Sequence, residues 1–509
     1  MKNNPYSATV QNGQAIALSA IPVINYPDFY QYVGLLLEKP NCHCVNYYLY
    51  PQDANTLKSI CAIADDKTGL IEIFSYELKG ENPQLEALTA KFYCMHVFER
   101  EIWENWGVIF LNHPWLKPIR FPFDRHNPGM KVNDYPFYKI KTQEMHEVGV
   151  GPIHAGVIEP GHFRFLCHGE MVYHLEIQLG WQHRGVESLY LEKNSQLQRH
   201  ILSECIAGDT AVGHNLTFAR ATEALLPKIN SQSLEAERCI ALEWERIAMH
   251  IFDLSNLCTG AAYQLGNSVF GALRTPIINF FQSWCGNRFA KSLIRTNGSH
   301  YPLTAALREK MWGILQDWEW KFDEIAHHTF NLSSVQNRFD DIGKLTQKQV
   351  HLIGAVGVAA RMANLSRDIR QSHPTELYKT AAYEPVLEAN GDVFARFFMR
   401  RLEIKKSITL IRKWLSDGSL WVETSPKPLR EQKPVFSPSS LSVSLTEAWR
   451  GEICHCAITN EQGELAHYKV KDPSLHNWTA LALSLRNLEI SDFPINNKSY
   501  NLSYCGHDL

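Results

Sequence analysis

The 509-residue sequence contains no CxxC motif, although it has 12 cysteines. Cysteine pairs at this spacing are the usual ligands of iron–sulfur, zinc and nickel sites, because the thiolates must converge on one point. We therefore do not expect this chain to hold a metal cluster by itself. The polar N-terminus, MKNNPYSATVQNGQ, has no secretory leader. Buried thiols or metal ligands in a reducing compartment are thus favoured over a disulfide framework.

Long apolar runs and a strong net charge are also missing. The most apolar stretch, 265–284, is interrupted by polar residues and proline, and it does not reach the roughly 18 uncharged residues of a membrane span. Lys and Arg number 50 against 53 Asp and Glu, a formal net charge of -3. This balance gives no argument for a nucleic-acid partner. No P-loop, G-x-S-x-G elbow or well-placed Rossmann fingerprint is found. We expect a soluble chain, at most seated on a membrane complex.

The 45% of hydrophobic residues is enough for two or more domains with a substantial core. Residues 25–120 mix β-like and helical runs, which predicts an α+β domain. The following FPFDRHNPGMKVN has two prolines, a glycine and no apolar periodicity, as in an inter-domain linker. The predicted organisation is a small α/β domain at 1–120, a linker at 121–140 and a large domain at 141–509.

Helical periodicity dominates the large domain. Ser233 is placed to cap a helix whose apolar residues recur from Ile240 to Leu254, and segments 303–332 and 393–415 show the same pattern. These segments favour a helical bundle over a doubly wound sheet. EICHCAI and ELAHYKV flank TNEQG and predict a β-hairpin. The predicted fold class is α+β, with a mainly helical-bundle large domain and peripheral β-hairpins.

Within this hairpin, Cys454, His455 and Cys456 are potential metal ligands. Alternate side chains of a strand point to opposite faces, so the two cysteines share a face and His455 points away from it. No second ligand pair lies nearby. Small buried side chains are therefore the preferred interpretation.

A glycine- and proline-rich segment at 149–164, GVGPIHAGVIEPGHFR, carries the residues best suited to chemistry. His154 and His162 can exchange protons near neutral pH on a tightly shaped loop. From composition alone, a structured turn with solvated polar residues is an equal alternative. Two further polar groups have a similar character: His183, Arg184 and Glu187, and Asp368, Arg370 and His373.

GPIHAGVIEPGHFRF followed by LGWQHRGVESL resembles the large catalytic subunit of energy-converting, membrane-bound nickel–iron hydrogenases and its relative, the quinone-site subunit of respiratory complex I. The resemblance continues through EAERCIALEWERIAMHI, MANLSRDIRQSHPTELY and GDVFARFFMRRLEIKKSI. HVFEREIWENWGVIFLNHPWLKPIRF is similar to the small partner subunit of complex I, which is often fused ahead of the large one. Nearly the whole chain is covered.

In the hydrogenases, the resemblance implies a nickel–iron site held by four thiolates from two CxxC pairs. His214 matches the family's histidine, but Ala207 and Thr210 stand at the first two ligand positions. Ser503 and Gly506 stand at the other two. A methyl group, two hydroxyls and a hydrogen cannot replace thiolates around soft metals.

In the complex I branch, the resemblance implies that the cavity that holds nickel and iron in the hydrogenases becomes the head of a quinone chamber. His154, which matches the family's G-P-x-H, and His162 are then candidates for the donor to the quinone oxygen. The family's quinone tyrosine and supporting acid have no counterpart at 198–201 or 260–262. Arg184 and Arg370 match basic residues near the cavity, while pairing with Glu187 and Asp368 is equally open. The predicted catalytic residues are His154, His162 and Arg184, and the predicted quinone-binding residues are His183, Glu187, Asp368, Arg370 and His214.

The leading hypothesis is an electron-transfer subunit of a membrane-associated, NADH dehydrogenase-like oxidoreductase that lacks a nickel–iron centre. The alternatives are a formate hydrogenlyase-like hydrogenase large subunit and a non-catalytic coupling or assembly subunit. Quinone is the expected ligand, with NAD bound elsewhere in the assembly and iron–sulfur clusters on partners. The expected partners are an iron–sulfur small subunit, a ferredoxin-like subunit and integral membrane antiporter-like subunits. The expected location is cytoplasmic, peripheral on the inner face of the cell membrane.

Overall fold

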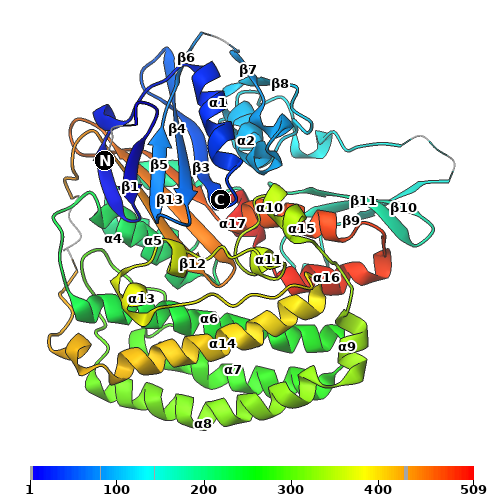
Figure 1. The fold of residues 1–509 in the computed structure, drawn as a ribbon, viewed down its shortest axis with the longest axis vertical. Helices are drawn as coiled ribbons and strands as arrows, with labels where there is room; N and C mark the ends of the chain where they lie inside the picture. The colour runs from blue at the N-terminus through cyan, green and yellow to red at the C-terminus, as the bar shows by residue number, and fades with distance from the viewer. Residues whose placement is uncertain (1–3, 81, 141, 143, 157, 429–433) are drawn as a thin grey trace.

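Sheets fill the upper part of the molecule and long helices form a layer below them (Figure 1). The computed structural model describes residues 4–80, 82–140, 142, 144–156, 158–428 and 434–509. The predicted α+β class is confirmed. Among the described residues, no helix is long and apolar enough to cross a membrane.

The N-terminal sheet is antiparallel, in the order β1 (Ala8–Gln11), β5 (Leu70–Phe74), β4 (Thr56–Asp65) and β3 (Cys42–Pro51), with β6 (Glu77–Lys79) paired to β4. A β-bulge between Cys44 and Asn46 places Val45 and Tyr47 on opposite sides of β3, although they are only two residues apart. Tyr47 packs among residues of α1 (Tyr26–Leu37) and α2 (His96–Trp106). Val45 packs against residues of a second sheet. The N-terminal sheet is therefore buried on both faces.

The second sheet has the order β14 (Leu465–Lys471), β13 (Gly451–Thr459), β12 (Ser440–Ala448) and β2 (Gln14–Ala17). The antiparallel pair β13 and β14 confirms the predicted hairpin. Cys454 and Cys456 are buried on the face toward the N-terminal sheet, with their sulfurs 3.8 Å apart. Every residue of β12 and β13 is buried, so these two strands of the sheet lie in the interior. The N-terminal strand β2 completes a sheet of the C-terminal part.

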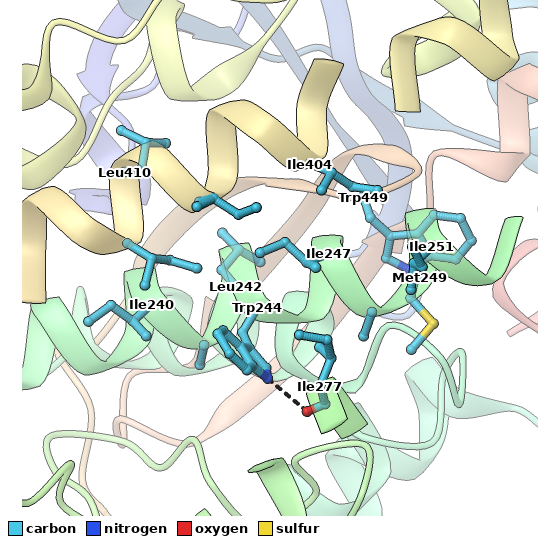
Figure 2. Close-up of a cluster of buried hydrophobic side chains, with 14 of the residues drawn as sticks. Ile240, Leu242, Trp244, Ile247, Met249, Ile251, Ile277, Ile404, Leu410 and Trp449 are labelled. Atoms are coloured by element: carbon cyan, nitrogen blue, oxygen red, sulfur yellow. Dashed lines mark hydrogen bonds between the residues drawn. The ribbon is translucent and has the colours of Figure 1, made fainter. Parts of the chain in front are cut away.

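The helical layer consists of α6 (Gln232–Gly260), α7 (Gln264–Cys285), α8 (Ala305–Phe330) and α14 (Val393–Ser416). The periodicity predicts α6, α8 and α14. Figure 2 shows Trp244 of α6 pointing to Ile277 of α7, whose carbonyl accepts the indole N–H at 2.8 Å. One predicted detail is wrong: α6 is capped by Ser231, whose hydroxyl accepts from the Leu234 amide, so the helix starts ahead of Ser233.

A third, partly exposed sheet projects to the right in Figure 1, in the order β15 (Leu488–Glu489), β11 (Met171–Gln178), β10 (His162–His168) and β9 (His146–Val150). The 121–140 segment holds one short turn of 3-10 helix, Val132–Asp134. The remaining elements are β7 (Gln84–Glu86), β8 (Ile109–Leu111), α3 (Val186–Glu192), α4 (Gln196–Ser203), α5 (Ala211–Glu223), α9 (Ser333–Phe339), α10 (Gln347–Leu352), α11 (Val358–Arg361), α12 (Ile369–Ser372), α13 (Glu376–Ala381), α15 (Ser474–Ser484), α16 (Phe493–Tyr500) and α17 (Tyr504–Asp508).

Candidate functional site

The loop between β9 and β10 carries His154, and His162 is the first residue of β10. His154 Nε2 lies 2.9 Å from the Gly161 carbonyl, and His162 Nδ1 lies 3.0 Å from the Gly151 carbonyl. A carbonyl only accepts, so each of these ring nitrogens carries the proton that it donates. Gly151 has φ 89°, and a Cβ there would lie 2.2 Å from the Gly161 oxygen. The loop is thus closed by two crossed histidine bonds around an obligatory glycine.

The two histidines differ in what their second nitrogen can do. Nε2 of His162 accepts a hydrogen bond from Arg164 Nε at 3.4 Å, so both of its nitrogens are engaged. Partial burial lowers the pKa of His162, and the nearby Arg164 lowers it further. Nδ1 of His154 has no hydrogen bond to any described residue. His154 is therefore the histidine of this loop that is open to a ligand.

The loop packs against the C-terminal helix α17. A Cβ at Gly161 would lie 2.6 Å from the Tyr504 ring, which shows how closely the loop approaches α17. Burial, and next the neighbouring Glu159 carboxylate, raise the pKa of Cys505 to about 12, so this thiol stays protonated at neutral pH. The histidine loop therefore lies against the segment that carries Ser503 and Gly506.

Arg184 joins this segment to the turn before α5. Its guanidinium donates to the carbonyls of Cys205 at 2.5 Å, Ile206 at 2.9 Å and Cys505 at 2.9 Å. Glu187 points elsewhere and accepts from Lys469 Nζ at 3.1 Å. The alternative in which Arg184 pairs with Glu187 is therefore wrong, because the arginine is committed to three backbone carbonyls.

Arg450 connects the first two implied ligand positions to the last two. Its guanidinium donates to Thr210 Oγ1 at 3.1 Å and to both carboxylate oxygens of Asp209, at 2.6 and 2.7 Å. Its Nε donates to the Asn501 carbonyl at 2.6 Å. Ala207, close by in the turn, is fully buried. A paired arginine thus lies between the two segments.

Asp472 fills the space beside Gly506 and His214. A Cβ at Gly506 would lie 2.7 Å from the Asp472 carboxyl and 2.9 Å from Ser503 Oγ. Asp472 Oδ2 accepts from His214 Nε2 at 2.9 Å. Burial alone would raise the pKa of Asp472, but the His214 bond and the Arg450 charge outweigh it and lower the pKa.

A buried hydrogen-bond chain continues from His214 into the hairpin. His214 Nδ1 lies 3.3 Å from His455 Nε2, and His455 Nδ1 lies 2.8 Å from the Tyr468 hydroxyl. Burial, with His214 next to it, lowers the pKa of His455 far below its usual value. His455 is therefore neutral and part of a polar network, on the face opposite to the cysteines, as predicted.

The sequence reasoning missed Arg450 and Asp472. These residues flank the predicted hairpin, one just before β13 and the other just after β14. Because the strands are antiparallel, the start of β13 and the end of β14 lie at the same edge. The charged residues directly before the first strand and directly after the second strand of the predicted hairpin could have indicated that they meet at one edge.

Three predicted residues lie away from the histidine loop. Arg370 binds Asp368 at 2.7 Å and Glu243 at 3.2 Å in a fully buried ionic cluster between α6, α12 and α14. This pairing is the structural alternative that the sequence left open for Arg370. His183 Nδ1 donates to the Asp508 carbonyl at 2.8 Å and so anchors α17. Across the part of the chain that the structure describes, no three His, Cys, Asp or Glu side chains are grouped to hold a metal ion.

Two family models match the chain. Residues 39–138 match the 30 kDa subunit of respiratory-chain NADH dehydrogenase, and residues 268–435 match its 49 kDa subunit. A carbon monoxide-induced hydrogenase of Rhodospirillum rubrum is 28% identical, over 68% of this chain and 95% of the relative. Formate hydrogenlyase subunit 5 of Escherichia coli is 22% identical, over 82% and 76%. The C/D subunit of the NADH-quinone oxidoreductase of Phocaeicola vulgatus is 22% identical, over 81% and 84%.

The relatives therefore include hydrogenase subunits as well as a fused C/D subunit. The matches lie in the order that the sequence motifs predict, with the 30 kDa model ahead of the 49 kDa model. The chain belongs to the family of the 30 kDa and 49 kDa subunits of respiratory-chain NADH dehydrogenase, with both parts in one polypeptide and a hydrogenase among its relatives.

Proposed function

We propose that this chain is an electron-transfer subunit of a membrane-associated oxidoreductase that reduces a quinone and holds no nickel–iron centre. The observation that carries the proposal is the meeting of the histidine loop and α17 at a site where Ala207, Thr210, Ser503 and Gly506 supply no thiolate. The family supports the oxidoreductase class.

The residues of the site do not fit a nickel–iron group. Gly506 has no room for a side chain beside the Asp472 carboxyl. The Arg450 guanidinium, a fixed cation, lies between the two segments that would have to supply the ligands. Cys205 is exposed and accepts a hydrogen bond from Lys291 at 3.9 Å. We therefore assign no chemistry to such a group.

Quinone reduction needs a donor for the carbonyl that becomes an oxyanion, and two protons for two electrons. His154 Nε2 is committed to the Gly161 carbonyl, so Nδ1 is the atom that faces the reaction. In the imidazolium form, Nδ1–H donates to the quinone oxygen, passes its proton to it and is reprotonated from solvent. His162, with both nitrogens engaged, holds the loop in shape. Arg184 positions α17 through backbone carbonyls.

Replacing His154 with alanine tests this role. We expect quinone-dependent turnover of the purified complex to fall about 100-fold, as for loss of a general acid, while the complex still assembles from the same proteins. His168→Ala is the matched control, because His168 is an exposed histidine at the far end of β10, the strand that follows the loop. Turnover is measured with reduced methyl viologen and decylubiquinone. Unchanged turnover with normal assembly would instead favour the non-catalytic coupling subunit.

A hydrogenase is the second candidate, because three of the relatives carry that name. Elemental analysis of the purified complex distinguishes the two. Stoichiometric nickel together with hydrogen evolution would favour the hydrogenase, whereas the proposal predicts neither.

We further propose that the electron donors are an iron–sulfur small subunit and a ferredoxin-like subunit, and that antiporter-like proteins anchor the assembly at the inner face of the cell membrane. The relatives are named as components or subunits of larger enzymes, and one is named membrane-bound. Ile153 in the histidine loop and Phe123 are each 81% exposed, so apolar surface is available beside the site. Affinity purification from membranes, with mass spectrometry of the recovered subunits, checks this set of partners.

A further inference from the structure

A cavity of about 320 Å³ lies where the N-terminal part meets the C-terminal elements. Its walls come from α2, β11, α10 and α15, with His507 of α17 at one side. Figure 1 shows α10, α15 and α17 near the middle of the molecule, with α2 above them and the projecting sheet to the right. None of the predicted site residues lines the cavity. Its size and its place between two parts of the chain are typical of small-molecule sites.

Aromatic and aliphatic side chains make up most of the wall. Tyr93, Trp115 and Trp478 present rings, and Leu175 and Leu475 are among the aliphatic residues. Flat rings and branched side chains together form a slot that suits a planar apolar body.

Two imidazoles in the wall each have a nitrogen without a partner. His96 is 2% exposed, and its Nε2 lies 3.2 Å from Thr479 Oγ1, while its Nδ1 is buried and unpaired. His174 Nε2 is also buried and unpaired. Burial, with Arg100 next to it, lowers the pKa of His96 far below the usual value, so this ring is neutral. Both nitrogens are covered by neighbouring atoms, so they belong to the interior of the wall and do not reach into the cavity.

The charge in the wall is positive. Arg100 is 8% exposed, and it donates to the carbonyls of Lys117 at 2.8 Å and Pro118 at 2.6 Å. Among the described residues, no carboxylate lies within 4.0 Å of Arg100 or of Arg486. Glu176 also lines the cavity, but it is already paired with Lys117 Nζ at 2.6 Å. A buried arginine without a carboxylate favours an anionic ligand.

We propose that this cavity binds a small planar aromatic carboxylate, with its ring between the aromatic side chains and its carboxylate toward Arg100 and Arg486. Thr479 can donate its hydroxyl proton to His96 Nε2, which keeps this polar pair satisfied within the wall. This site is separate from the histidine loop and does not depend on the proposed function.

Titration calorimetry on the purified full chain tests the proposal, with 2-naphthoate as the probe and neutral 2-naphthamide as its uncharged counterpart. We expect 2-naphthoate to bind and the amide to bind at least about tenfold more weakly, since a charge-assisted hydrogen bond is lost. Arg486→Gln should weaken the carboxylate about tenfold and leave the amide unchanged. The Arg486 side chain is exposed and has no hydrogen bond to a described residue, so this variant should fold.

Ala482→Phe provides the second variant, because Ala482 lines the cavity and is only partly buried, so a ring there fills the space. It should abolish binding of both probes. Arg288→Gln, an exposed arginine that does not line the cavity, should change nothing. The proposal is overturned if 2-naphthoate does not bind below about 1 mM. Equal binding of acid and amide, or binding that survives Ala482→Phe, would overturn it as well.

Discussion

At Gly506, close packing leaves no room for a side chain, and therefore none for a metal ligand. Its Cα hydrogens face the Asp472 carboxyl and Ser503 Oγ, and there is no space for another atom. The identities of Ala207, Thr210, Ser503 and Gly506 were sufficient to predict the loss of thiolates from the sequence. The groups that take their place were not predictable, because Arg450 and Asp472 are brought there by a hairpin distant in sequence.

Gly506→Ala should lower the free energy of unfolding by about 1–3 kcal/mol, as for overpacking of a filled site. Chemical denaturation of the purified chain measures the change. Gly208→Ala is the matched control, because a Cβ at Gly208 meets nothing within 4 Å. Equal stability of the two variants would show that the space beside Asp472 is not filled as described.

Among the elements, α2 and β14 are joined by a buried ion-pair group. Glu101 of α2 contacts Arg120 and binds Lys469 of β14 at 2.5 Å. Burial alone would raise the pKa of Glu101, but Arg120 and Lys469 outweigh it and hold the pKa well below 4.5. The sequence predicted β14 as one strand of the hairpin, but it predicted only unspecified helical runs in the region that contains α2. It did not predict their contact, because no local sequence pattern shows which buried carboxylate pairs with which buried cation.

Glu101→Gln should destabilise the chain by about 3–5 kcal/mol at neutral pH, since two buried cations lose their carboxylate. In the folded wild type this carboxyl has a lowered pKa, so its contribution is present above pH 4.5 and is lost as the pH falls below that value. The difference in unfolding free energy between wild type and variant should therefore shrink on acidification. Urea unfolding at several pH values measures it, with exposed Glu77→Gln as the control. A difference that stays constant with pH would contradict the assignment.

For the whole molecule, the predicted division into two parts matches the changes in composition along the sequence. It does not match the packing, in which the two parts are joined. Residues of β3 and β4 share one hydrophobic core with residues of β12 and β13, and β2 lies in the C-terminal sheet. Composition and linker signals can separate 1–120 from 141–509, but they cannot show that the two parts bury each other's sheets. That information lies in long-range contacts, which have no local signature.

The shared core predicts that both parts unfold together. Cys61 of β4 and Cys454 of β13 are both fully buried, and they report on the two parts. Pulse labelling of thiols along a denaturant series should expose both at the same midpoint. Exposure of Cys61 at a clearly lower denaturant concentration would mean that the N-terminal part unfolds independently.

The central claim is that this family member passes electrons to a quinone at the histidine loop without a nickel–iron centre. The most direct test is the rate at which the purified complex oxidises reduced methyl viologen with decylubiquinone as the acceptor, compared between wild type and His154→Ala. We predict quinone-dependent turnover that falls about 100-fold in the variant. Absence of any quinone-dependent turnover in the wild-type complex would contradict the account.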